Sequence, residues 1–210
     1  MRKINEIFIN GICLEKILED HKKWLNKKND GKRADLSYAN LSDADLSLAD
    51  LRCADLSYAD LRFADLKNTD LSDVDLSYAD LRFTDLSSAI LRFANLIRID
   101  LRGADLSDSD LRGADLSDSD LRGANLSYAD LISADLSYAD LEGTDLINAD
   151  LNDTDLSYAN LSGADLRFTD LSYANLSYAD LIDTDLRDAN LTNADLTNVD
   201  LSYADLSDAD

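Results

Sequence analysis

Proline is absent from this 210-residue sequence, and cysteine and histidine are scarce. The two cysteines, Cys13 and Cys53, are too few for a disulfide framework, which favours a reducing, intracellular setting. His21 is the only histidine, so the sequence contains no Cys/His cluster that would indicate a zinc site. We expect the His21 ring to be packed in the fold or solvated. No glycine-rich phosphate loop is present either. The sequence therefore predicts a protein without enzymatic activity, cofactor or specific metal site.

Basic residues are also few, since 20 Lys and Arg face 43 Asp and Glu and give a formal net charge of -23. Phosphate binding needs a basic surface, so direct nucleic-acid binding is not expected. A basic protein, cations, or a protein that itself binds DNA remain as partners. No stretch reaches the about 18 apolar residues of a membrane span, and no signal-peptide cleavage site is visible. The default location is the cytoplasm.

A five-residue repeat fills most of the chain. From Ala34 onward, 35 leucines follow one another at every fifth position, from Leu36 to Leu206. A small residue, mostly Ala, lies two positions before each Leu, and Asp or Asn directly precedes it, except at Ile90. Neither a helix, at about 100° per residue, nor a flat strand of period two keeps such leucines in one environment. The chain must turn in every unit, and stacked coils then bury Leu and expose Asp.

This unit, first seen as Ala-Asp-Leu-Ser-Tyr at residues 34–38, resembles the pentapeptide-repeat family. The resemblance covers residues 34–210 and implies an all-β fold. Its form would be a right-handed parallel β-helix of quadrilateral cross-section, with four units per coil and about nine coils. The small residue and the Leu would line the interior, and the other three positions would face solvent. The lead-in over residues 14–33 is similar to segments that precede the repeats in some bacterial members.

Residues 1–33 differ from the repeats, because they carry 9 basic and 5 acidic side chains. Their apolar residues fall at helical spacing and predict an amphipathic helix over about residues 14–27 that caps the first coil. We expect Gly31 to end this segment and residues 4–9 to add a strand. Trp24 should pack on the first coil. The full set of residues expected in this packing is Leu14, Ile17, Leu18, Trp24 and Leu25.

No comparable cap is visible at the C-terminal end, where the repeats run in register to Asp210. An open solenoid end exposes backbone and apolar groups that need covering. Tail-to-tail dimers occur in the family that the repeat resembles. We therefore expect either a continuing chain or a homodimer, with the dimer contact at Leu201, Tyr203 and Leu206.

Residues 20 apart are expected to lie on the same face of successive coils, so that the sequence forms columns. We interpret these columns mainly as stacking of identical side chains that stabilises the coils, with a ligand-binding stripe as the alternative. We interpret the Asp columns as turn chemistry, in which Asp and Asn side chains hydrogen-bond to nearby backbone and favour turns. The alternative is that they present negative charge to a partner. The tyrosine column contains Tyr38, Tyr58, Tyr78, Tyr138, Tyr158 and Tyr178, and the arginine column contains Arg62, Arg82, Arg102 and Arg122, with Phe63 and Phe83 beside it.

Residues 89–100 depart from the regular repeat. Ile replaces the usual Asp there, and apolar and basic residues alternate nearby. Exposed apolar patches on a polar surface often mark interaction sites. Drift of the repeat is the simpler explanation. The candidate interaction patch consists of Ile90, Arg92, Phe93, Ile97 and Arg98.

The acidity of the repeats leaves three functions open. The favoured one is a non-catalytic protein-interaction scaffold with an unidentified partner. The alternative is a DNA mimic, because the repeats hold 38 acidic and 11 basic residues. Over a rod of roughly 40 Å, their net charge of -27 gives about one charge per 1.5 Å, similar to the about one charge per 1.7 Å of B-DNA.

The family resemblance implies a type II topoisomerase such as gyrase as the target of a mimic. Two departures oppose the gyrase-protecting members: no loop interrupts the coils, and no Phe takes the central Leu position. The third possible function is that of a mainly structural rod, or of a rod that binds cations along its aspartates.

Overall fold

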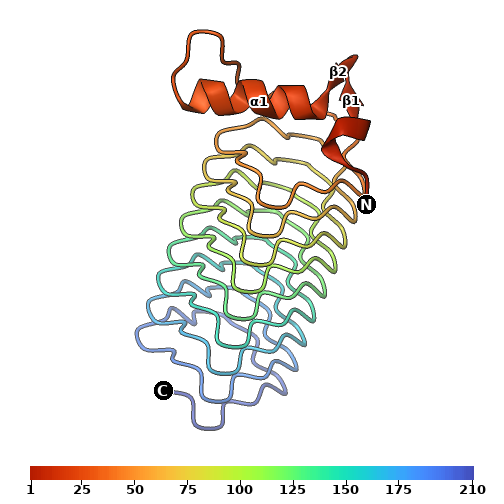
Figure 1. Ribbon diagram of the computed structural model, residues 1–210. Helices are drawn as coiled ribbons and strands as arrows, with labels where there is room; N and C mark the ends of the chain where they lie inside the picture. The colour runs from red at the N-terminus through yellow and green to blue at the C-terminus, as the bar shows by residue number, and fades with distance from the viewer.

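The chain winds into a rod of stacked coils that take 20 residues each. The computed structural model describes residues 1–210 and shows the helix α1 (Leu14–Leu25) across one end of the rod and the C-terminus at the other (Figure 1). Parallel bridges join residues 20 apart, from Asp35 with Asp55 to Asp185 with Asp205. Since the sequence unit has five residues, each coil holds four units. The bridges are isolated, so the sides of the coils are too short to count as extended strands.

Each unit turns directly after its leucine. In the first unit, the Ala39 N–H donates to the Leu36 carbonyl at 3.1 Å and closes a turn over two residues. The second of these, Tyr38, has a φ of 57°, and the same left-handed backbone recurs at this position in the following units. This conformation is unfavourable for residues other than glycine. The coil therefore needs strong compensation elsewhere.

Backbone hydrogen bonds between coils provide part of that compensation. The Leu36 N–H donates to the Asp55 carbonyl at 2.7 Å, and the Asp55 N–H donates back to Ala34 at 3.0 Å. A third bond runs from the Tyr38 N–H to the Ser57 carbonyl at 3.0 Å. The same pattern continues along the rod. Neighbouring coils are thus held at the spacing of paired strands, about 4.8 Å.

Leucine and the small residue fill the interior. From Leu36 to Leu186, every repeat leucine is at most 1% exposed. Each such burial contributes about 2 kcal/mol, which explains why no unit departs from Leu. Thr replaces Ala in some units and remains satisfied, as when the Thr69 hydroxyl donates to the Leu46 carbonyl at 3.0 Å. Ser109 and Ser119 are exceptions, because their buried hydroxyls have no hydrogen-bond partner.

Residues 1–33 form a small unit at the end of the rod (Figure 1). Its elements are the 3-10 helix η1 (Ile4–Glu6), the strands β1 (Phe8–Ile9) and β2 (Ile12–Cys13), and the helix α1 (Leu14–Leu25). The two strands pair antiparallel, so a hairpin takes the place of the single strand expected over residues 4–9. Arg2 bridges to Ala44 in parallel and extends the stack by one residue. Neither helix has the length and hydrophobicity needed to cross a bilayer.

The side chains expected in the packing of α1 differ in their burial. Leu14 is fully buried, and Ile17 and Leu18 are partly buried against the core. Leu25 is half-buried. Trp24 remains 37% exposed and stacks on the His21 ring, at a centroid distance of 5.6 Å. The fully buried aromatic ring of α1 is therefore His21, and Trp24 covers it.

Gly31 serves a close approach of two chain segments and does not end the helix as expected. α1 ends at Leu25, and the next residue, Asn26, donates its N–H to the Lys22 carbonyl. A Cβ on Gly31 would lie 2.2 Å from the backbone nitrogen of Trp24. Only glycine allows the chain to return this closely past α1 before the first coil begins.

His21 connects α1 to the first coil. Its Nδ1 accepts a hydrogen bond from the Ala34 N–H at 3.0 Å, so the neutral ring carries its proton on Nε2, which is buried without a partner. Burial lowers the pKa of His21, while the backbone of Arg52 and the carboxylate of Asp50 oppose this shift. The nearby guanidinium of Arg33 lowers it further. His21 is thus held in its neutral form.

Acidification should loosen the contact between α1 and the coils. Protonated His21 cannot accept the Ala34 N–H, and its pKa in the folded state lies below that of a free histidine, about 6.5. Its stabilising contribution is therefore complete at neutral pH and is lost as the pH falls below about 6.5 through the folded pKa. We expect the fluorescence of Trp24, the only tryptophan, to change with this titration.

The control is His21→Gln, whose amide oxygen can accept the same N–H without titrating. Its Trp24 fluorescence should stay constant between about pH 7 and about pH 4.5. A wild-type signal that matches the His21→Gln signal throughout this range would rule out the proposed role of the ring.

Candidate interaction surface

The outward aspartates take part in the turns of the coils. The Oδ1 atom of Asp35 accepts hydrogen bonds from the N–H and the hydroxyl of Ser37, at 3.2 and 2.7 Å. Asp195 accepts the same pair of bonds from Thr197. These bonds lower the pKa of both carboxyl groups. Such local bonds favour turns, so the structure supports turn chemistry as one role of the aspartates.

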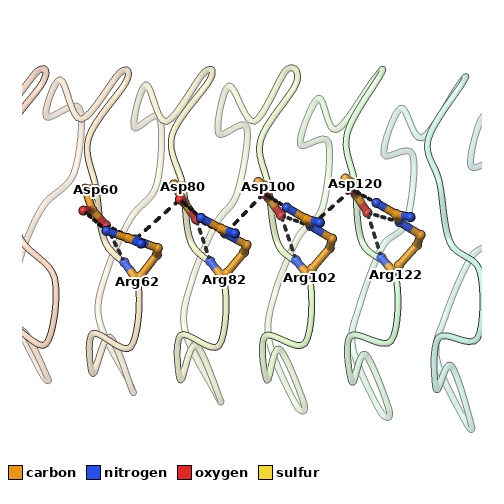
Figure 2. A network of polar contacts seen from close by, with 8 residues as sticks. All are labelled: Asp60, Arg62, Asp80, Arg82, Asp100, Arg102, Asp120 and Arg122. Carbon is orange, nitrogen blue, oxygen red and sulfur yellow. Dashed lines mark hydrogen bonds and ion pairs between the residues drawn. The ribbon is translucent and has the colours of Figure 1, made fainter.

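Arginine side chains form a ladder of ion pairs along one face of the rod (Figure 2). Nε and one terminal nitrogen of Arg62 donate to the two carboxylate oxygens of Asp60, at 2.8 and 2.7 Å. Nε also lies 3.6 Å from a carboxylate oxygen of Asp80 on the next coil. The Arg62 side chain lowers the pKa of Asp60. The arrangement repeats at Arg82, Arg102 and Arg122.

The ladder offsets repulsion between stacked carboxylates. Unit charges about 4 Å apart repel by about 1 kcal/mol in water, and successive aspartates of a column lie one coil apart. Each exposed ion pair contributes less than about 1 kcal/mol, but the pairs here share their carboxylates in a network. The arginine column therefore has a structural role, as its regular spacing suggested.

Asparagine provides a second means of reducing this repulsion. The Nδ2 group of Asn125 donates to the Asp105 carboxylate, one coil earlier, at 3.1 Å. An amide thus replaces a charge and adds a bond between coils. The same contact is made by Asn95, Asn160, Asn175 and Asn190, each to the Asp 20 residues before it.

The tyrosines stack in two groups along another face. The ring centroids of Tyr38 and Tyr58 lie 4.8 Å apart, and the same spacing separates Tyr138 from Tyr158. Tyr78 and Tyr178 complete the two groups. Between them, the guanidinium of Arg98 lies 5.9 Å from the Tyr78 ring centroid and pairs with Asp118 at 3.3 Å. The column is occupied throughout by its own side chains, which supports a structural role.

The candidate interaction patch lies on two neighbouring turns of one coil. Arg92 and Phe93 are on one turn, and Ile97 and Arg98 are on the next. Because Ile90 replaces the usual Asp, Arg92 has no carboxylate partner in its own unit and pairs with Asp110 on the next coil.

Phe93 contributes the largest exposed apolar area of this patch. It is 67% exposed, whereas Ile90 is 36% exposed and Ile97 is half-buried. Its ring covers Gly113 on the next coil, where an added Cβ would lie 2.7 Å from the ring. Since the two arginines are already paired, Phe93 is the side chain of the patch most available to a partner.

Basic residues are distributed unevenly, which the residue columns alone did not reveal. Residues 52–122 contain nine Lys and Arg, whereas residues 123–166 contain none and carry nine acidic side chains. We call residues 123–166 the uncompensated stretch, because it contains no basic residue of its own; three of its carboxylates, Asp130, Asp140 and Asp165, pair with arginines outside it. Within it, burial and the neighbouring carboxylates of Asp170 and Asp130 raise the pKa of Asp150. A count of charges per coil along the sequence would have located this stretch.

The last coil exposes core positions that are buried elsewhere. Leu206 is 39% exposed and Leu201 is half-buried, whereas Leu181 and Leu186, one coil earlier, are fully buried. Tyr203 is 87% exposed. Leu201 and Leu206 thus contribute core positions to an apolar end face, and Tyr203 is an outward turn residue of the same coil.

The repeats of this chain match a known family of proteins. A family model described as pentapeptide repeats (8 copies) matches residues 32–62, 54–92, 89–128, 124–157, 149–188 and 174–210. Among solved structures, one match is HetL, described as a pentapeptide repeat protein involved in heterocyst differentiation regulation in the cyanobacterium Nostoc sp. strain PCC 7120. It is 34% identical, with coverage of 88% of this chain and 94% of that chain and a TM-score of 0.57.

Trypsin-treated QnrB1, a plasmid-mediated fluoroquinolone resistance protein, also matches. One form is 20% identical over 84% of this chain and 86% of that chain, with a TM-score of 0.64. A second form is 25% identical over 85% and 81%, with a TM-score of 0.53. The first likeness shows the fold alone. Curated proteins gave no significant match.

Asp110 and Asp150 lie in the same column but have different charged neighbours, so substitution by Asn should change the free energy of unfolding in opposite directions. Arg112 holds the pKa of Asp110 low, so this carboxylate stabilises the fold above about pH 4, and its contribution is lost as the pH falls through the folded pKa. Asp150, in the same column, has a raised pKa and destabilises the fold at neutral pH. We expect Asp110→Asn to lower and Asp150→Asn to raise the free energy of unfolding at neutral pH, each by less than about 1 kcal/mol.

Denaturant unfolding at neutral pH and below about pH 3 measures both effects. The Asp150→Asn difference should vanish at the lower pH, where that carboxyl group is protonated in either state, and the Asp110→Asn difference should shrink as the pH falls through the lowered folded pKa of Asp110. Equal signs for the two variants at neutral pH would refute this reading of the column.

Proposed function

Because the chain belongs to the pentapeptide-repeat family, whose members fold as right-handed quadrilateral β-helices, we propose that it is a non-catalytic scaffold that binds a partner protein. One observation carries this proposal: the interior of the repeats is filled by Leu and small residues, so within residues 34–210 recognition falls to the outward side chains. Those columns give the repeats a net charge of -27. A charged, convex surface suits protein binding better than catalysis, which needs a pocket.

Within this proposal, residues 34–210 are the binding domain, with about nine coils of 20 residues. Residues 1–33 act as the cap of the first coil. The burial of Ile7 and Leu14 against the core supports this assignment. A cytoplasmic location is part of the proposal and fits the two free cysteines. Direct contact with nucleic acid or membrane is not proposed.

The candidate interaction patch is the proposed specific contact on the coils. Phe93 supports it most strongly, because a large exposed apolar side chain on an acidic rod favours desolvation by a partner. Docking through this ring should depend little on salt.

A DNA-mimicking binder of a type II topoisomerase such as gyrase is the second candidate. Its support is the charge density, concentrated in the uncompensated stretch, which has nine carboxylates and no basic residue and in which Asp130, Asp140 and Asp165 pair with arginines outside it. A mimic of this kind should bind through electrostatics that weaken as salt screens them.

A supercoiling assay with gyrase and the purified protein separates the two candidates. Salt-sensitive inhibition at micromolar or lower concentration is the result that mimicry requires. If tens of micromolar protein leave supercoiling unchanged, gyrase mimicry is set aside. For the scaffold, partners captured by the wild type should be lost on Phe93→Ala with Ile97→Ala, and full retention would refute the proposed patch.

We also propose that the apolar end face of the last coil pairs with a second copy of the chain, through Leu201, Tyr203 and Leu206. Leu201 and Leu206 are apolar positions of the repeat, and Tyr203 adds a large ring at the turn between them. Sedimentation equilibrium should give a dimer for the wild type and a monomer for Leu206→Asp. A wild-type monomer at all concentrations would exclude this mode of assembly.

A further inference from the structure

A hollow between α1 and the first coil is lined by apolar side chains from three parts of the chain. Its volume is about 480 Å³. Ile4 of η1, Leu18 of α1 and Leu48 of the first coil all contribute to its wall. Ile4 and Leu18 are partly buried, whereas Leu48 is 77% exposed. The hollow is open to solvent and large enough for one or two aliphatic side chains.

Leu48 is unusual among the residues of its kind. It is the second turn residue of its unit, and no other unit has an aliphatic side chain at this position. Its backbone adopts a φ of 61°, which is strained for a leucine, and the same column continues with Asn68, Ser88 and Asp108. A strained and exposed leucine adds little to the stability of the coil. Its position beside the hollow favours a role in binding.

The rim of the hollow is acidic. Glu15 and Glu19 of α1 and Asp45 of the first coil line it, and Lys22 is the only basic residue among the lining residues. Glu19 lies 3.9 Å from Lys16, whereas Glu15 is in no ion pair. An entering segment therefore meets both apolar side chains and an excess of negative charge among the lining residues. These features complement an aliphatic side chain flanked by basic residues.

We propose that this hollow binds a short segment of a partner protein in which leucine or isoleucine is flanked by lysine or arginine. The proposal rests on the scaffold function and names one of its docking sites. The aliphatic side chain would pack on Leu18 and Leu48, and the basic groups would face Glu15, Glu19 and Asp45. A second copy of the chain fits less well, because its net charge of -23 would oppose the acidic rim.

The probe is a fluorescein-labelled peptide with leucines between lysines, titrated into the full chain and followed by fluorescence anisotropy. Leu48→Asn is the test variant, because Asn68 and Asn148 occupy the same column and show that the turn accepts this residue. Tyr128→Asn is the matched control, since Tyr128 lies in the same column far from α1 and is 62% exposed. Thermal unfolding of both variants checks that the fold is retained.

We expect Leu48→Asn to weaken binding of this peptide by about tenfold or more and Tyr128→Asn to leave it unchanged. A peptide with glutamate in place of lysine should not bind, and added salt should weaken the lysine peptide. Equal binding to wild type and Leu48→Asn, equal binding of the glutamate peptide, or no binding by the wild type would each overturn the proposal.

The docking site and the scaffold function can fail separately. If partners bind the coils of Leu48→Asn as they bind the wild type while the peptide binds neither, the hollow is not a docking site and the scaffold function stands. If the peptide binds as expected but the coils bind no partner, the function is confined to the end of the rod.

Discussion

Every outward side chain of the rod is placed by the backbone hydrogen bonds between each unit and the unit 20 residues further on. These bonds stack identical backbone positions at the spacing of paired strands. They also hold the second turn residue of each unit in a left-handed conformation, whether it is Gly or Tyr. The surface is therefore a set of fixed columns, and substitutions change what a column displays without changing where it lies.

Stacked carboxylates are the main consequence of this arrangement. Three kinds of side chain moderate them: Ser and Thr donate hydroxyls within the turn, Arg bridges two coils, and Asn replaces a charge. Around Asp150, where arginine is missing, burial and the neighbouring carboxylates of Asp170 and Asp130 raise the pKa of this residue. The uncompensated stretch differs from residues 52–122 in containing no basic residue that could pair with its carboxylates within the stretch. Electrostatic recognition of a partner should be strongest there.

The repeat made most of the fold predictable. A Leu at every fifth residue required a turn in each unit, and columns at a period of 20 located the stacked tyrosines and the arginine ladder. Residues 1–33 were less predictable, because no repeat determines their packing. Burial of His21, the close approach at Gly31 and the hollow beside Leu48 depend on how α1 crosses the first coil. Helical periodicity predicts the helix but not its contacts.

Deletion of one whole coil tests the 20-residue period most directly. Removing residues 103–122 joins Arg102 to Gly123, restores the Arg-Gly junction and keeps every later column in register. Removing only residues 103–107 preserves the leucine period but moves each later column to the next face. Thermal unfolding should occur close to the wild-type temperature for the first deletion and clearly lower for the second. Equal midpoints for the two deletions would contradict the claim that side-chain contacts within the columns of this period stabilise the rod.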